Sequence, residues 1–98
     1  MATPHIDAFA ADAVLFERAY SHVPLTLPSH ATLMTGRLPP EHGARDNKGY
    51  FLGPENVTLA ERLSLAGYRT GAVVSSMVLG RPTGMDQGFQ DYDDRMEP

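Results

Sequence analysis

The stretch "TLAERLSLAGYRTGAVVSS", residues 58–76, decides the fold class of this chain. Thr58 and Glu61 match the S/T-x-x-E capping box, in which the two side chains satisfy N–H groups at the start of a helix. Apolar residues then recur at helical spacing, and Gly67 stands where that pattern stops. The pattern predicts a helix over residues 59–66.

The second half of this stretch, "RTGAVVSS", residues 69–76, contains a short continuous apolar run bounded by polar residues. Such a run is typical of a strand that is buried on both faces of a parallel sheet. A helix followed by a buried strand is the repeating unit of α/β proteins. We therefore expect an α/β fold.

Two further elements are expected near the N-terminus. Pro4 stands at a first helical position, where its missing N–H costs nothing, and this predicts a helix over residues 4–12. The segment "VLFERAY", residues 14–20, is rich in β-branched and aromatic residues with partial alternation. That composition predicts a strand.

The segment "PSHATLMT", residues 28–35, predicts another short helix. Its proline can open the helix, Leu33 and Met34 can face a core, and Gly36 stands where a left-handed C-cap is expected. Residues 37–55 follow and contain several prolines and glycines. They predict an irregular surface segment.

The C-terminal part of the sequence is turn-rich over residues 80–88 and ends in "FQDYDD", residues 89–94, where we expect a last short strand. The acidic residues Asp91, Asp93 and Asp94 lack the glycine turn and distal glutamate of an EF-hand loop. Charge runs of this kind usually face water, so we interpret them as a solvated acidic turn and not as a metal site.

Composition excludes several functional classes. The chain has 98 residues, 42% of them hydrophobic and 20% charged, which fits one small globular domain. A net charge of -4 argues against nucleic acid as a structural partner. No apolar run is long enough to span a membrane, and no signal peptide is visible. Cysteine is absent, which leaves the localisation open, and the oligomeric state is equally open.

Thr26 lies in "PLTLPSHATLMTGRLPPEHGARDN", residues 24–47, just before the predicted helix. Free N–H groups and the positive end of the helix dipole favour the binding of anions at the start of a helix. Thr26 is therefore either a helix-capping or solvated hydroxyl, or a nucleophile that attacks a bound phosphate or sulfate ester. A threonine nucleophile needs a metal ion or an adjacent base to lose its proton.

Three segments, "TPHIDAFAADAVLFERAY", "PSHATLMTGRLPPEHG" and "TLAERLSLAGYRTGAVV", resemble in order the N-terminal part of the sulfatase family, within the alkaline phosphatase superfamily. The family signature is C/S-x-P-S-R followed by A-x-L-x-T-G-R, and its second half matches from Ala31 to Arg37. The first half departs at two positions. Thr26 stands in place of the Cys or Ser that becomes formylglycine, and His30 in place of the Arg.

The first half is closer to nucleotide pyrophosphatases/phosphodiesterases of the same superfamily, whose pattern is T-x-P-N-H…T-G-x-x-P…H-G…D-N. The matching residues are Thr26, Pro28, His30, Thr35, Gly36, Pro39, His42, Gly43, Asp46 and Asn47. The resemblance implies that Thr26 is the nucleophile on a two-zinc centre and that Asn47 helps to hold the attacked oxygen. Ser29 departs from the Asn of the pattern, and the G-K-W-H-L-G motif of sulfatases is absent at residues 75–80.

The resemblance implies a fragment of an alkaline phosphatase-like three-layer αβα sandwich with a mostly parallel sheet. Residues 1–98 would be a partial domain that lacks the first strand and the C-terminal part. A divalent metal, zinc or calcium, is implied in the complete protein. Its ligands would be the Thr26 oxygen and residues outside this chain.

These observations predict part of a metal-dependent hydrolase of sulfate or phosphate esters. Thr26 and Asn47 are the expected catalytic residues, and His30 and Arg45 are expected to bind the anionic ester. His42 is a structural histidine unless its motif match gives it a role. The alternative is a noncatalytic remnant or small binding module that retains the scaffold. The isolated chain is expected to be inactive.

Overall fold

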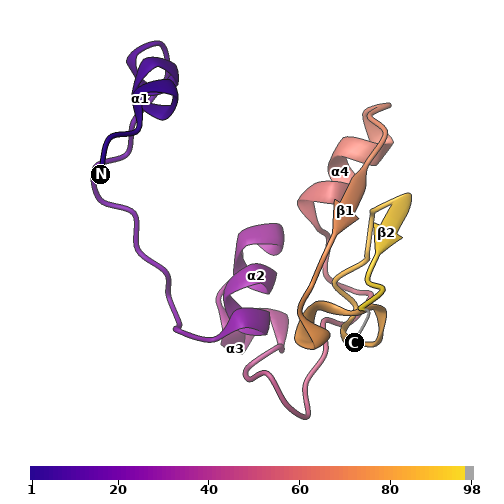
Figure 1. Cartoon of the computed structure of the whole chain (residues 1–98). Coiled ribbons are helices and arrows are strands. Elements are labelled where there is room, and N and C mark those ends of the chain that lie inside the picture. The colour runs from indigo at the N-terminus through magenta and orange to yellow at the C-terminus, as the bar shows by residue number, and fades with distance from the viewer. Residues whose placement is uncertain (97–98) are drawn as a thin grey trace.

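The computed structural model describes residues 1–96 and has both helices and a small sheet (Figure 1). The elements in chain order are α1 (Pro4–Ala11), α2 (Thr26–Thr35), α3 (Pro39–His42), α4 (Leu59–Leu65), β1 (Gly71–Val73), η1 (Met77–Leu79), η2 (Arg81–Thr83) and β2 (Asp91–Asp93). η1 and η2 are single 3₁₀ turns. No helix within residues 1–96 is long and apolar enough to cross a membrane.

The two strands pair in parallel, with Gly71 opposite Asp91 and Val73 opposite Asp93. This pairing confirms the expected α/β class and the last strand, whereas the three-layer sandwich stays a prediction. The strand expected within residues 69–76 forms, as β1, and is parallel as expected, but the expectation that it is buried on both faces is wrong. β1 has three residues, and Val73 is 83% exposed because the sheet has only two strands in the part of the chain described.

The core lies between α2 and the segment that follows β1. α2 packs against α3, α4 and η1. The buried apolar residues that form one cluster are Leu27, Ala31, Ala44, Leu52, Leu79, Met85 and Tyr92. This core holds α2 in place from three sides, so the residues at the start of α2 are carried by a packed helix.

The capping box at α4 is confirmed. The Glu61 N–H donates to the Thr58 Oγ1 at 3.1 Å, and the helix ends at Leu65, one residue earlier than expected. The apolar stripe of this helix is largely exposed, and Ala60 is its buried residue. The capping is local and therefore readable from sequence, whereas the burial depends on neighbouring elements.

The strand expected over residues 14–20 is not formed, and this prediction is wrong. The segment is an irregular extension between α1 and α2, and its large apolar side chains are exposed (Figure 1). A strand needs a neighbour to satisfy its N–H and C=O groups, and no strand of the described chain lies beside it. α1 itself forms as expected but buries no residue.

Two expectations around α2 also need correction. The helix begins at Thr26, two residues before the proline that was expected to open it, and Leu33 is 74% exposed instead of facing the core. Gly36 is the left-handed C-cap, as expected, with φ 70°. The segment over residues 37–55 is largely irregular, yet it contains the short helix α3 and buried residues, so it is not a purely surface segment.

Candidate active site

Asn47 contacts the start of α2 directly. Its Oδ1 accepts a hydrogen bond from the backbone N–H of Leu27 at 2.9 Å, across 20 residues of sequence. An N–H can only donate, so the carboxamide orientation is fixed and the Nδ2 group points its hydrogens elsewhere. Within residues 1–96 this Nδ2 has no hydrogen-bond partner. The predicted pair of Thr26 and Asn47 is thus brought to one helix end.

Two of the four N–H positions at the start of α2 are free and two are not. The Leu27 N–H is taken by Asn47 and Pro28 has no N–H, whereas the Ser29 N–H makes the first hydrogen bond of the helix itself, to the Leu25 carbonyl at 3.1 Å. The N–H groups of Leu25, the N-cap, and of Thr26 have no partner in the described chain. An anion at this end of α2 therefore meets two free amides and the Asn47 side chain.

Thr26 is not the capping residue of α2. The N-cap is Leu25, which has no side-chain acceptor, and Asn47 supplies the missing one. The Thr26 side chain is half-buried, and its hydroxyl makes no hydrogen bond to any described residue. A hydroxyl that neither caps the helix nor pairs with a neighbour is free to meet a ligand.

His30 folds back onto its own helix. Its Nδ1–H donates to the Thr26 carbonyl at 2.7 Å, so a neutral ring carries the proton on Nδ1 and presents Nε2 with a lone pair. The side chain is exposed. Its contact with Thr26 places His30 one turn from the candidate nucleophile, and its role in substrate binding stays a prediction.

Arg45 is exposed, and its guanidinium lies 3.5 Å from the Pro40 carbonyl oxygen. This contact is long and holds the side chain weakly against α3. The expected role of Arg45 in binding an anionic ester therefore stays a prediction.

His42 is buried between α2 and the loop that carries Asn47. Its Nδ1 accepts from the Ala44 N–H at 3.1 Å, and its Nε2–H donates to the Thr32 Oγ1 at 3.0 Å. Burial lowers the pKa of His42, while the nearby Pro28 backbone and the charge of Glu41 oppose that shift. The positions of the histidines in the sequence did not predict these contacts of His42. The signal that singled out His42 was its match, with Gly43, to the H-G part of the motif.

Asp91, Asp93 and Asp94 at β2 are ion-paired and not simply solvated, which corrects the interpretation of this turn. Their partners are Arg69 for Asp91 at 2.7 Å, Arg95 for Asp93 at 2.8 Å and Arg81 for Asp94 at 2.6 Å. The Arg95 side chain donates hydrogen bonds to the Asp93 carboxylate and so holds the pKa of Asp93 well below its usual range.

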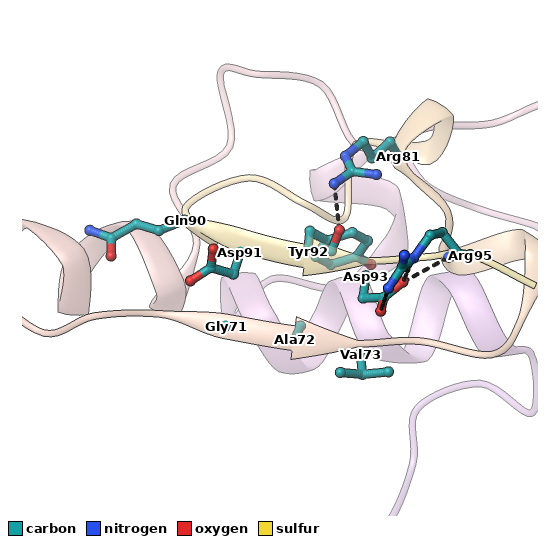
Figure 2. Close-up of a pocket in the computed structure, with 9 residues that line it drawn as sticks. All are labelled: Gly71, Ala72, Val73, Arg81, Gln90, Asp91, Tyr92, Asp93 and Arg95. Atoms are coloured by element: carbon teal, nitrogen blue, oxygen red, sulfur yellow. Dashed lines mark hydrogen bonds and ion pairs between the residues drawn. The ribbon is translucent and has the colours of Figure 1, made fainter.

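A hollow of about 600 Å³ lies on the sheet. Among the residues that line it, Arg95 points at Asp93 and Arg81 reaches the Tyr92 carbonyl (Figure 2). The carboxylates of this region are occupied by arginines. Among residues 1–96 no group of three or more His, Cys, Asp or Glu side chains is placed to hold a metal ion. The described residues alone do not fit a divalent-metal site, so zinc or calcium stays a prediction for the complete protein.

Comparisons with known proteins identify the family. The sulfatase family model matches residues 1–97. The N-acetylglucosamine-6-O-sulfatase of Bacteroides thetaiotaomicron is 32% identical over 84 residues, which cover 86% of this chain and 15% of that protein. Arylsulfatase A of Homo sapiens is 41% identical over 75 residues, 70% of this chain and 15% of that protein.

The N-acetylgalactosamine-6-sulfatase of Mus musculus is 34% identical over 105 aligned positions, covering 92% of this chain and 20% of that protein. No solved structure gives a significant match. The chain spans about 15% of the length of the first relatives, and the match runs through Thr26, α2 and α4. The resemblance of the quoted segments is confirmed, and the chain belongs to the sulfatase family.

Proposed function

We propose that this chain carries the nucleophile of a sulfate ester hydrolase and that Thr26 is that nucleophile. The observation that carries the proposal is the hydrogen bond from the Leu27 N–H to the Asn47 Oδ1, which places the Asn47 carboxamide beside the first turn of α2. The relatives in the family are named as sulfatases, which supports a sulfate ester as the substrate class.

In the proposed reaction the Thr26 Oγ1 attacks the sulfur atom of the ester. An Oγ1–S bond forms as the Thr26 hydroxyl loses its proton, the bond from sulfur to the leaving oxygen breaks, and one proton, equivalent to the one lost from Thr26, ends on the leaving alcohol. Water then hydrolyses the threonine sulfate, which releases sulfate and restores the hydroxyl. The balance is one ester and one water in, one alcohol and one sulfate out.

The donors at the helix start support this assignment. The Thr26 N–H and the Asn47 Nδ2 are both without a partner in the described chain. Such preorganised donors stabilise negative charge that develops on the sulfuryl oxygens during attack. Arg45 would add positive charge for an anionic ester, and His30 lies in the turn that contacts Thr26.

Phosphate esters are the second candidate substrate class. A threonine at the nucleophile position together with the Asp46–Asn47 pair is the pattern of phosphodiesterases of the same superfamily. Attack on phosphorus would use the same Oγ1 and the same donors. The two substrate classes therefore differ in the substrate offered and not in the residues invoked.

The test compares an aryl sulfate with an aryl phosphodiester, using the protein at full length with its metal content restored. Thr26→Val removes the hydroxyl with little change of shape, and Thr26→Ser keeps a hydroxyl as the matched control. We expect Thr26→Val to lose turnover by about 10³-fold or more, as for other nucleophile replacements. Turnover retained by Thr26→Val would overturn the nucleophile assignment. No turnover of either ester by the unmodified protein would favour the noncatalytic binding module.

A further inference from the structure

One imidazole joins α2 to the loop that carries Asn47. His42 ends α3 and is 2% exposed. On one side its Nε2 lies 3.0 Å from the Thr32 Oγ1 of α2. On the other side its Nδ1 lies 3.1 Å from the Ala44 backbone nitrogen. The ring therefore joins Ala44, two residues further along the chain, to Thr32, which lies ten residues before His42.

The roles of the two ring nitrogens are fixed by their partners. The Ala44 N–H can only donate, so Nδ1 must accept and the proton of the neutral ring lies on Nε2. That Nε2–H donates to Thr32. The lowered pKa of His42 agrees with a ring that is neutral at neutral pH.

The loop after His42 has little else to fix its path to Asn47. Gly43 turns the chain with φ 89°, and Ala44 is fully buried directly after it. Arg45 and Asp46 are exposed, and the Arg45 guanidinium makes a long contact of 3.5 Å with the Pro40 carbonyl. The Ala44 N–H is therefore the last backbone group hydrogen-bonded to the body of the protein before Asn47, whose side chain accepts from Leu27.

We infer that His42 is a positioning residue that holds Asn47 against the start of α2 through the hydrogen bond from the Ala44 N–H to its Nδ1. The structural part of this inference concerns the chain alone. Its consequence for turnover rests on the proposed function of Thr26 and Asn47. His42 touches neither the ester nor the reacting atoms in this scheme.

The two hydrogen bonds of the imidazole, which we call its arms to Ala44 (through Nδ1) and to Thr32 (through Nε2), can be tested separately. Asparagine presents an amide oxygen near the place of Nδ1, so His42→Asn keeps an acceptor for Ala44 and loses the arm to Thr32. Glutamine presents an amide nitrogen near the place of Nε2, so His42→Gln keeps the arm to Thr32 and loses the acceptor. A side chain that merely fills space would not distinguish these two variants in this direction.

The readout is hydrogen exchange of single amides in the ¹⁵N-labelled chain. Among the described residues the Leu27 N–H has one hydrogen-bond acceptor, the Asn47 Oδ1, so its exchange reports how well Asn47 is held. We expect His42→Gln to lower the protection of Leu27 and Ala44 about tenfold, the effect of losing one buried hydrogen bond. We expect His42→Asn to keep it within about threefold.

Two controls isolate the effect. Thr32→Val removes the acceptor of Nε2 and should leave the Leu27 protection unchanged. The Val74 amide, which donates to the Asp93 carbonyl at 2.9 Å in the sheet, should keep its protection in every variant and report an intact fold. Equal protection of Leu27 in His42→Gln and the unmodified chain would overturn the inference.

If His42→Gln also lowers the protection of Val74, this variant has disturbed the fold and cannot test the inference. The inference is then tested by the tautomer of His42 in the unmodified chain. Long-range nitrogen–proton NMR should find Nδ1 without a proton, and a proton on Nδ1 would overturn the inference. Failure of the proposed function is seen separately, because an inactive full-length protein with the expected exchange pattern would contradict Thr26 catalysis and leave the positioning role of His42 in place.

Discussion

The Asn47 side chain caps α2, a helix that begins 21 residues earlier, at Thr26. The Asn47 Oδ1 accepts a hydrogen bond of 2.9 Å from the N–H of Leu27, the residue after Thr26. Most helices take this acceptor from the N-cap residue itself. Here the N-cap is Leu25, which has no polar side chain, and a distant loop supplies the group. The same contact stabilises α2 and brings a carboxamide to the candidate nucleophile.

Replacing Asn47 should separate these two effects. Asn47→Ala leaves the Leu27 N–H without its acceptor and should lower the free energy of unfolding by about 1 kcal/mol, the usual cost of a lost cap. Asn47→Asp keeps an oxygen acceptor and adds a negative charge at the positive end of the helix, so its stability should be retained. Urea unfolding of the chain measures both.

The activity of the two Asn47 variants should not follow their stability. Both lack the Nδ2 donor, and Asn47→Asp also repels an anionic ester, so both should lose turnover in the proposed reaction. An Asn47→Ala chain that unfolds at the same urea concentration as the unmodified chain would contradict the capping role.

The sequence predicted those elements whose causes are local. α4 with its Thr58 cap and the C-cap Gly36 depend on residues within a few positions of one another. The strand over residues 14–20 and the buried strand around β1 depend on neighbouring strands, which local pattern does not contain. Those two expectations failed for this reason.

Gly88 should be far less tolerant of substitution than Gly49. Both have positive φ, 88° and 79°, so alanine is strained at either position. At Gly49 an added Cβ meets open space, whereas at Gly88 it would lie 2.2 Å from the Glu61 backbone nitrogen.

Gly49→Ala should therefore cost about 1 kcal/mol of unfolding free energy. Gly88→Ala should cost at least about 2 kcal/mol more, because the backbone of α4 must move away. Thermal unfolding of the two variants measures the difference. Equal melting temperatures would show that α4 does not press against Gly88 as described.

Thr58 should stabilise the fold through its hydroxyl. The side chain is 1% exposed, accepts from the Glu61 N–H at 3.1 Å and donates to the Gln87 carbonyl at 2.9 Å. Thr58→Val keeps the shape of the side chain but leaves the Glu61 N–H and the Gln87 carbonyl without their hydrogen-bond partner. We therefore expect the free energy of unfolding to fall by about 1–3 kcal/mol.

Thr58→Ser is the matched control, because it keeps the hydroxyl and removes one methyl group. We expect it to cost about 1 kcal/mol, less than the valine variant. Chemical denaturation measures the free energy of unfolding of the two variants and shows which is the less stable. A valine variant as stable as the serine variant would mean that packing, and not the hydroxyl, is what matters at this position.

The candidate site was predicted less completely than the helices. The motif match singled out Thr26 and Asn47, and the structure joins them through Leu27. The expected free amides are reduced to those of Leu25 and Thr26 because Asn47 occupies the Leu27 N–H and Pro28 has none. The bridging contacts of His42 involve backbone groups, which a sequence pattern does not display.

His42 should make the stability of the chain depend on pH. Its folded pKa is lowered mainly by burial, although the neighbouring Glu41 charge opposes this, so the unfolded imidazole, with an ordinary pKa of about 6.5, binds its proton first. As the pH falls through that value the unfolded state gains protons that the folded state lacks, and the free energy of unfolding decreases.

The measurement is urea unfolding at several pH values between about 8 and 5.5, above the range where carboxylates titrate. The unmodified chain should lose stability progressively below about pH 6.5, and His42→Asn, which has no group to protonate there, should show a flatter profile. His22→Asn removes an exposed histidine and is the matched control. If the His42 and His22 variants keep the same slope as the unmodified chain, His42 does not carry the pH dependence, because only a group with different pKa values in the two states can produce it.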